Sequence, residues 1–218
     1  MAIIDIKNVG FQDGDQKILE GITFSVESGN FVLLAGPSGS GKSSLLKLIN
    51  DLQSPSEGQI LFHGKDIKDY SPIELRRRIS YCLQTPIFFG EKVLDDMEFV
   101  FASRGQELDK TRMAQVMEFF KLDPSYLEKE VINLSGGEKQ RLALVRSLIF
   151  KPEVLLLDEV TSALDEDNAL ILESAIQSLN RDGLTVIWIS HQVDRHRKLA
   201  NKVVSLEAGR LVGVEVNK

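Results

Sequence analysis

The sequence predicts an α/β fold built on a mostly parallel β-sheet, and three observations predict it. Runs of almost continuous Val, Leu and Ile, as in residues 154–157 and 185–190, are typical of strands that are covered on both faces. Segments with helical apolar spacing alternate with such runs in the second half of the chain. A glycine-rich loop at residues 36–43 joins an apolar run, residues 31–35, to a helical segment, residues 44–49.

The bulk composition is that of an ordinary globular domain. The chain has 218 residues, of which 43% are hydrophobic, so we expect one domain that can bury a substantial core and fold by itself. Its formal net charge is -6 and its basic residues are scattered, which argues against a nucleic-acid partner. The single cysteine, Cys82, excludes an internal disulfide framework, and we interpret it as a small buried core residue.

The amino terminus does not have the pattern of a signal peptide or a membrane span. Asp5 interrupts the first apolar residues, and no window approaches 18 uninterrupted apolar residues. We therefore expect that the chain does not enter a membrane by itself.

The first 84 residues are expected to form mainly sheet. Short strands separated by glycine-containing turns are predicted at residues 3–7, 22–26, 31–35 and 60–62. A short helix is predicted at residues 73–78, directly after the Ser71-Pro72 pair, and a buried strand at residues 79–83.

The pattern changes after Gln84. Apolar residues recur at helical intervals in residues 93–103, 109–120 and 138–150, which predicts a helical insert of about sixty residues. Strands are predicted again at residues 154–157 and 185–190, with a helix at 167–181, and the chain closes with strands at 203–206 and 211–214.

The loop GPSGSGKS is predicted to bind a nucleoside triphosphate. Its small residues let successive backbone amides converge on an anion, and its place between a strand and a helix separates it from a glycine-rich turn without a ligand. Lys42 is expected to neutralise the outer phosphates, Ser43 to ligate Mg2+ and Ser44 to contact the inner phosphate. The predicted nucleotide contacts in this loop are Gly36, Pro37, Ser38, Gly39, Ser40, Gly41, Lys42, Ser43 and Ser44.

Two adjacent carboxylates follow the predicted strand at residues 154–157. Asp158 stands at the carboxyl end of that strand, where open α/β sheets place their ligands, and is predicted to hold Mg2+ directly or through water. Glu159 is predicted to be the general base that orients and polarises the attacking water. The alternative, a solvated acidic residue at a strand end, leaves the repulsion between the two carboxylates without compensation.

The segment LSGGEKQR, residues 134–141, has the pattern of a helix start. Ser135 is predicted to be the N-cap, with Glu138 in the capping-box position three residues later. Gly136 and Gly137 can also expose backbone amides to an anion. The octet precedes the next buried strand, and in sequence and position it resembles the signature motif of ABC-type ATPases.

This resemblance implies a fold, a division of the chain and a partner. The implied fold is that of a P-loop NTPase (RecA-like) with a mostly parallel sheet, an N-terminal antiparallel β subdomain and a helical signature subdomain. Residues 1–218 would form a single ABC ATPase domain, with the nucleotide-binding core in 1–84 and 150–218 and the helical subdomain in 85–149. ATP and Mg2+ would join two copies in a homodimer, in which Ser135, Gly136 and Gly137 of one copy complete the ATP site of the other.

Three further positions correspond to motifs of the same family. Gln84 resembles the Q-loop glutamine, which contacts Mg2+ and the attacking water, and residues 162–165 resemble the D-loop, which reaches across the dimer. His191 resembles the switch histidine that contacts the terminal phosphate. His63 and His196 correspond to no position of the family pattern and are expected on the surface.

The sequence departs from the family pattern at two positions. Asp13 stands where the family usually has an aromatic residue that stacks on adenine, and the nearest aromatic residue, Phe11, either supplies the stacking or belongs to the core. Val160 replaces the usual proline, which should affect backbone stiffness more than chemistry.

Segments 8–19, 80–90 and 134–168 resemble a bacterial group within the family, the FetA (YbbL) type of ATP-binding subunit associated with iron export. This likeness implies a separately encoded integral-membrane permease of the FetB type and a peripheral location at the cytoplasmic face of the inner membrane. The permease is expected to dock near Gln84 and the Phe88-Phe89 pair, unless that pair belongs to the core. The alternatives are the ATPase subunit of an importer or of a lipoprotein-release system, which shares these motifs, and a soluble ABC ATPase outside transport.

Overall fold

The computed structural model describes residues 2–217, which divide into two compact units. The first unit runs from residue 2 to Tyr81 and also contains Pro152–Glu159 and the residues from Leu179 to 217. The second contains Cys82–Lys151 and Val160–Ser178. The domain limits expected from the family resemblance stay a prediction.

The first unit begins with an antiparallel sheet of the strand order β2-β1-β4-β5. Its strands are β1 (Ala2–Asp13), β2 (Gln16–Glu27), β4 (Glu57–Phe62) and β5 (Lys65–Asp66). The first two strands extend further than the sequence predicts, because their hairpin end pairs polar residues such as Gln12 and Lys17. These residues are exposed, so they carry no apolar alternation from which a strand could be predicted.

A second sheet has the order β10-β9-β3-β8-β7-β6 and confirms the α/β fold class. Strand β3 pairs in parallel with β8 and β9, β7 pairs in parallel with β8, and β10 pairs antiparallel with β9. All residues of β3, β7 and β8 are buried, as expected for strands covered on both faces. The six strands are β3 (Phe31–Ala35), β6 (Ile79–Cys82), β7 (Val154–Asp158), β8 (Thr185–Ile189), β9 (Lys202–Glu207) and β10 (Arg210–Val216).

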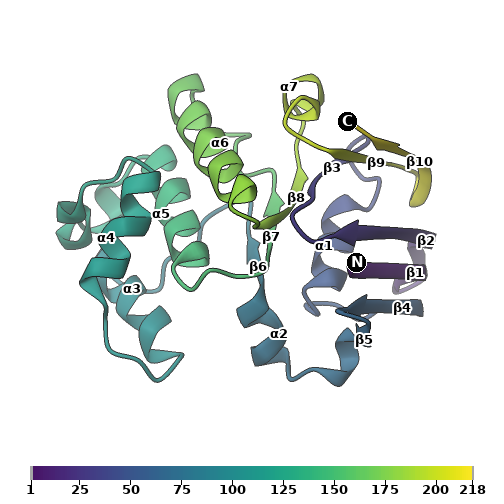
Figure 1. The fold of residues 1–218 in the computed structure, drawn as a ribbon, viewed down its shortest axis with the longest axis horizontal. Helices are drawn as coiled ribbons and strands as arrows, with labels where there is room; N and C mark the ends of the chain where they lie inside the picture. The colour runs from purple at the N-terminus through teal and green to yellow at the C-terminus, as the bar shows by residue number, and fades with distance from the viewer. Residues whose placement is uncertain (1, 218) are drawn as a thin grey trace. The chain divides into compact units, whose positions relative to one another are not determined.

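Alternate residues of the central strands face two different layers. On one side Val32, Leu34 and their neighbours join one core with helix α1 (Lys42–Ile49) and the antiparallel sheet, next to which Figure 1 shows α1. On the other side Trp188 stacks on Phe31, with ring centroids 5.9 Å apart, and is covered by helix α7 (Val193–Arg197). The unit also contains helix α2 (Pro72–Arg78) and a 3-10 turn, Ile67–Asp69.

The second unit is helical. Its elements are α3 (Val93–Ala102), α4 (Lys110–Phe119), α5 (Gly136–Leu148), the greater part of α6 (Glu166–Arg181), and the 3-10 turns Pro124–Glu128 and Val131–Asn133. The predicted helices agree with the observed ones to within two residues at each end. An ion pair of 2.7 Å between the guanidinium of Arg146 and Oδ2 of the fully buried Asp96 joins α5 to α3.

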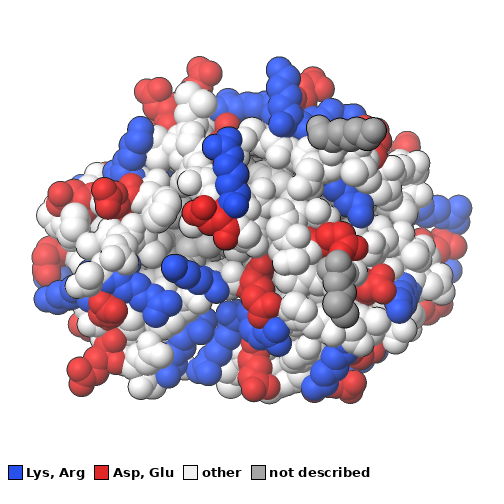
Figure 2. All heavy atoms as spheres, in the orientation of Figure 1, with Lys and Arg blue, Asp and Glu red and all other residues white. Residues whose placement is uncertain are grey.

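Charges of both signs are interspersed over the face of the molecule shown in Figure 2. This agrees with the scattered basic residues of the sequence and shows no block of positive charge on that face. No helix within residues 2–217 is both long enough and apolar enough to cross a membrane.

Candidate functional site

The predicted phosphate-binding loop lies between β3 and α1, and two of its glycines are required by its geometry. Gly36 has φ 140, and a Cβ atom there would lie 2.0 Å from the carbonyl oxygen of Leu206. Gly41 has φ 94, and a Cβ atom there would lie 2.5 Å from Cδ2 of Leu19. Any larger residue at either position would force the surrounding backbone or core to move, so the loop can keep its shape only with glycine.

Lys42 is the buried cation of this loop. Only 5% of the residue is exposed, and its Nζ donates hydrogen bonds to the carbonyl oxygens of Gly36 at 2.9 Å and Pro37 at 2.7 Å. Burial lowers the pKa of Lys42, and the negative charges of Glu159 and Asp158 oppose this shift. The ammonium group is therefore held at the loop, where it can meet the outer phosphates of a nucleotide.

Both carboxylate oxygens of Asp158, at the end of β7, accept hydrogen bonds. The hydroxyl of Ser43 donates to Oδ1 at 2.9 Å, and the hydroxyl of Tyr81 donates to Oδ2 at 2.7 Å. A hydroxyl and a carboxylate side by side are the hard oxygen ligands that Mg2+ prefers, so the donor set fits this ion. Tyr81 was not predicted from the sequence, because one tyrosine in an apolar strand carries no motif.

Glu159 follows with an unusual backbone conformation. Its φ is 51, in the left-handed region, which costs a residue with a side chain about 1 kcal/mol. Its N–H donates to the carbonyl oxygen of Ile189 at 3.0 Å, which ties this backbone to the neighbouring strand β8. The carboxylate then meets His191, whose Nε2 lies 2.8 Å from Oε1 of Glu159. Two of the predicted catalytic residues, Glu159 and His191, are therefore in direct contact.

The loop and Glu159 border a pocket of about 320 Å3 in the first unit. Its lining residues are Gln16, Ile18, Ser38, Gly39, Ser40, Gly41, Lys42, Ser43, Ser44 and Glu159. None of them is aromatic. Phe11 is only 9% exposed and packs in the hydrophobic core, which favours the core over adenine stacking as its role. Ile18 and Gln16, on β2, border the loop instead, and no motif in the sequence marks them.

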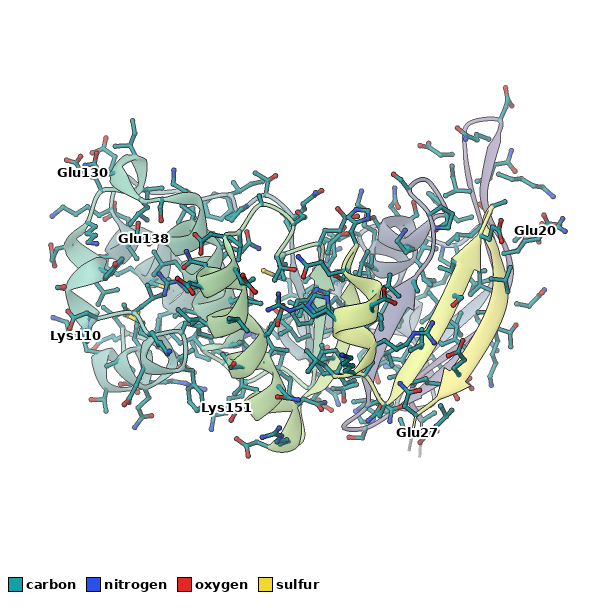
Figure 3. All side chains as sticks on the ribbon, turned by 90° about the horizontal axis from the view of Figure 1, so that it is seen from above. Glu20, Glu27, Lys110, Glu130, Glu138 and Lys151 are labelled. Atoms are coloured by element: carbon teal, nitrogen blue, oxygen red, sulfur yellow. The ribbon has the colours of Figure 1, made fainter. Side chains whose placement is uncertain are left out.

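Residues 134–141, which resemble the signature motif, lie in the second unit. They begin α5 with the predicted capping box. The N–H of Glu138 donates to Oγ of Ser135 at 3.2 Å, and the N–H of Ser135 donates to Oε2 of Glu138 at 2.7 Å. A hydrogen bond of 2.7 Å from the Tyr126 hydroxyl, together with the bonds from Ser135, lowers the pKa of Glu138 to about 2. Figure 3 labels Glu138 on the helical part of the chain.

The two glycines of this segment differ in their surroundings. Gly136 is exposed, with space around it for a Cβ atom, whereas Gly137 is buried and a Cβ atom there would lie 2.7 Å from the side chain of Asn168. Asn168 in turn hydrogen bonds to the carboxylate of Asp165, in the segment that resembles the D-loop. Ser135 and Gly136 thus present an open helix start, and Gly137 allows close packing behind it.

Gln84 and the two phenylalanines that follow it also lie in the second unit. Gln84 is exposed, and its Nε2 lies 3.5 Å from Oγ of Ser162. Phe88 is half-buried and Phe89 is 69% exposed, so the pair does not belong to the core. The guanidinium of Arg146 lies over both rings, at 5.5 and 5.7 Å.

One of the two histidines expected on the surface is there and the other is not. His63 is exposed, and its Nε2 lies 2.6 Å from Oε2 of Glu153. The expectation for His196 is wrong, because its exposure is 0% and its ring stacks on Trp188 with centroids 4.5 Å apart. The short helix α7 turns this side chain onto the sheet. Cys82 is buried, as predicted.

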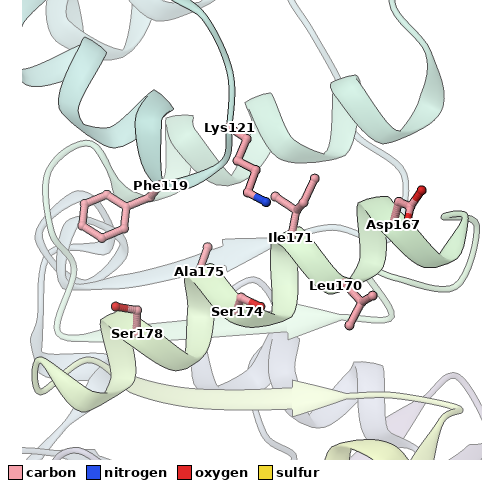
Figure 4. A pocket seen from close by; sticks show the side chains of 8 residues that line it. All are labelled: Phe119, Lys121, Asp167, Leu170, Ile171, Ser174, Ala175 and Ser178. Carbon is pink, nitrogen blue, oxygen red and sulfur yellow. The ribbon is translucent and has the colours of Figure 1, made fainter.

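The second unit contains a hollow of about 490 Å3 between the end of α4 and the face of α6 (Figure 4). It is lined by Phe119, Lys121, Asp167, Leu170, Ile171, Ser174, Ala175 and Ser178. None of the predicted site residues lines it. In the described part of the chain, no group of three or more His, Cys, Asp or Glu side chains is arranged to hold a metal ion.

Comparison with known proteins agrees with these features. The family model described as "ABC transporter" matches residues 19–162. Over 94% of its length the chain is 43% identical to the "probable iron export ATP-binding protein FetA" of Escherichia coli, of which it covers 91%. It is 37% identical to "ABC transporter I family member 17" of Arabidopsis thaliana, over 93% of this chain and 77% of that protein.

Two solved structures have the same fold along almost the whole chain. One is cbiO1 from Clostridium perfringens, part of the ABC transporter complex cbiONQ, with 26% identity, a TM-score of 0.87 and coverage of 99% of this chain and 88% of that one. The other is the ATP-binding cassette MJ0796 as a dimer in a post-hydrolysis state with ADP and Pi, with 25% identity, a TM-score of 0.85 and 99% coverage of both chains.

Proposed function

The chain belongs to the ABC transporter family, and from this membership we propose that it drives a separately encoded permease that exports iron or another metal. It is an ATP-binding, ATP-hydrolysing subunit of a family whose ATPase domains dimerise and work with membrane permeases. The proposed cargo rests on one observation, the 43% identity over 94% of this chain to a relative named for probable iron export.

The first step of the proposed cycle is the capture of the triphosphate by the loop at the start of α1. The amides of Gly39, Gly41, Lys42 and Ser43 would face the phosphate oxygens, aided by the positive end of the helix. The Nζ of Lys42 now donates to two loop carbonyls, and it would exchange these contacts for oxygens of the outer phosphates. Ser44 would meet the inner phosphate.

The metal-binding residues are proposed to be Ser43 and Asp158, whose oxygens lie 2.9 Å apart. When bound, Mg2+ supplies positive charge to the β- and γ-phosphates. Tyr81 keeps one oxygen of Asp158 in a hydrogen bond and thereby fixes the orientation of the carboxylate.

Hydrolysis is proposed to use Glu159 as the general base. Its carboxylate would accept a proton from the water that attacks the γ-phosphorus, while the bond from that phosphorus to the bridging oxygen of ADP breaks. His191 would contact the terminal phosphate, and its Nε2 lies 2.8 Å from Oε1 of Glu159. Phosphate and ADP are the products.

The second half of each site is proposed to come from a second copy of the chain. Ser135 and Gly136 are exposed at the start of α5, where the backbone amides of a helix attract an anion. In a head-to-tail dimer these amides would reach the γ-phosphate bound to the partner copy. ATP would then join the two copies, and hydrolysis would release them.

The permease is proposed to be of the FetB type in the inner membrane, with this subunit at its cytoplasmic face. Phe89 is 69% exposed and Ile87 52% exposed, and both belong to the segment that follows Gln84. Neighbouring exposed apolar side chains of this kind are suited to hold a helix of a partner protein.

The experiment that tests the cargo is reconstitution of the subunit with a FetB-type permease in proteoliposomes. We expect ATP hydrolysis to be stimulated by Fe2+ or another divalent metal and to be accompanied by movement of that metal across the bilayer. The Glu159→Gln variant, reconstituted in parallel, should show neither ATP hydrolysis nor metal transport.

Stimulation by amino acids or lipoproteins, without any response to metals, would favour an importer or a lipoprotein-release system. A subunit that does not associate with membranes containing the permease would favour the soluble alternative.

A further inference from the structure

His196 is a buried histidine that has no role in the proposed catalytic cycle. Its exposure is 0%, and its imidazole stacks on the indole of Trp188 at an interplanar angle of 28°. Trp188 belongs to β8, the strand that ends just before His191. A polar ring at this depth needs a specific partner, because an unsatisfied buried polar group is destabilising.

The partner is the hydroxyl of Ser190, the residue directly before His191. Nδ1 of His196 lies 2.5 Å from Oγ of Ser190. The same Oγ accepts a hydrogen bond of 3.0 Å from the N–H of Gln192, the residue directly after His191. A single hydroxyl therefore bridges the two residues that flank His191, and His196 binds that hydroxyl from the core side.

A second link closes the turn from the backbone. The N–H of His196 donates to the carbonyl oxygen of Gln192 at 3.0 Å, so both peptide groups of Gln192 are used, one by Ser190 and the other by His196. The carbonyl oxygen of His196 accepts from the N–H groups of Leu199 and Ala200 at 3.0 and 3.1 Å. His196 thus connects the chain on both sides of the turn to the face of the sheet.

We infer that His196 is a positioning residue for His191. By binding Ser190 it holds the turn that carries His191 in the conformation in which Nε2 of His191 meets Oε1 of Glu159. The inference rests on the proposed role of His191 in the ATPase site. This role differs from core filling alone, because an apolar ring could fill the space under α7 but could not bind the Ser190 hydroxyl.

Two substitutions of His196 distinguish a positioning role from a core-filling role. The two roles predict opposite orders of kcat for the two variants. His196→Phe keeps an aromatic ring over Trp188 and loses the bond to Ser190. His196→Asn loses the ring but places an amide group near the position of Nδ1. If His196 positions the turn, His196→Phe lowers kcat about tenfold with KM for ATP changed less than about twofold. His196→Asn then keeps the higher kcat of the two, although it unfolds at a lower temperature.

Substitutions of Ser190 test the same link independently, because they leave the ring of His196 stacked on Trp188. Ser190→Ala should lower kcat by a similar factor, and Ser190→Thr should restore most of it. The double variant Ser190→Ala with His196→Phe should be no slower than the slower single variant, within about twofold, because both remove the same link. His63→Gln, a change to an exposed histidine outside this cluster, should leave kcat unchanged.

The experiment is steady-state ATP hydrolysis by the isolated subunit, with the affinity of each variant for a fluorescent ATP analogue measured alongside. A native kcat in His196→Phe and Ser190→Ala would overturn the inference, and so would a higher kcat in the Phe variant than in the Asn variant. His191→Ala, tested in the same series, separates the proposed role of His191 from that of His196. If that variant hydrolyses ATP at the native rate, the proposed role of His191 is wrong. If it is inactive while the His196 and Ser190 variants are normal, only the positioning role is wrong.

Discussion

Nε2 of His191 lies 2.8 Å from Oε1 of Glu159, at the adjoining ends of two parallel strands. Strand β7 pairs with β8 so that Asp158 lies beside Ile189, which brings the residues that follow the two strands to the same edge of the sheet. The left-handed backbone of Glu159 then turns its carboxylate toward His191. The base and the histidine proposed to contact the phosphate are thus in direct contact.

Glu159→Gln should separate ATP binding from hydrolysis. Glutamine has nearly the same size and can keep the contact with His191, but it cannot accept the proton of the attacking water. We expect phosphate release to fall about a hundredfold or more, with the affinity for ATP retained. In Mg-ATP the variant should accumulate as a dimer in size-exclusion chromatography.

The matched control for this prediction is Glu20→Gln. Glu20 is an exposed residue of β2, labelled in Figure 3, and its carboxylate pairs with Arg210 at 2.9 Å on the surface. This variant should hydrolyse ATP at the native rate. Turnover at the native rate in Glu159→Gln as well would remove Glu159 from the role of base.

Tyr81→Phe should weaken the response of the enzyme to magnesium. The change deletes the hydroxyl that donates to Oδ2 of Asp158 and leaves the ring in place. We expect the Mg2+ concentration for half-maximal ATPase activity to rise about tenfold, a size typical of the loss of a group that orients a metal ligand. Nucleotide binding measured in EDTA should not change.

Tyr70→Phe is the control for the loss of a hydroxyl in the same unit. Its hydroxyl donates to the carbonyl oxygen of Phe62 at 2.9 Å, away from Asp158. Both variants should lose about 1 kcal/mol of stability, but only Tyr81→Phe should change the magnesium dependence. An equal magnesium response in the two variants would contradict the orienting role of Tyr81.

The parts of the site that form local motifs were predictable from the sequence. The loop before α1, Asp158 at the end of β7 and the capping box between Ser135 and Glu138 each consist of neighbouring residues whose order expresses their chemistry. The buried strands were predictable for a similar reason, because strands covered on both faces consist of consecutive apolar residues.

The remaining features depend on contacts between residues far apart in the chain. Tyr81 is important only because β6 brings its hydroxyl to Asp158, and His196 is buried only because α7 turns back onto Trp188. Helix α7 itself has only five residues, of which Val193 is the one apolar residue, so it carries no apolar period. From the sequence, Phe11 could either stack on adenine or belong to the core. Its burial favours the core.

Glu138 should make the stability of the helical unit depend on pH in the acid range. Hydrogen bonds from Tyr126 and Ser135 hold the pKa of Glu138 at about 2, below its usual value of 4.5. Because the folded pKa is depressed, the contribution of Glu138 to stability is complete above about pH 4.5 and is lost as the pH falls toward 2. Glu138→Ala should therefore cost about 1 to 2 kcal/mol at pH 7 and progressively less in acid.

Urea unfolding of the variant and the native protein between pH 7 and pH 3, followed by circular dichroism, measures this difference. Glu118→Ala, in an exposed glutamate of α4, is the control and should show a smaller difference without the same pH dependence. A stability difference for Glu138→Ala that stays constant over this range would contradict the low pKa.

Cys82 should be chemically inert in the folded protein. Burial raises the pKa of its thiol to about 12, and the neighbouring Arg146 and Ser147 only partly oppose this shift. At pH 8 the thiolate is then about one part in ten thousand, and the sulfur is also shielded from reagents. We expect almost no reaction with Ellman's reagent in buffer and full reaction of one thiol in denaturant.

Ser174→Cys, on the exposed face of α6, should add one thiol that reacts within minutes in the native protein. If Cys82 reacted in the native protein as fast as that added thiol, its segment would open far more often than its burial allows.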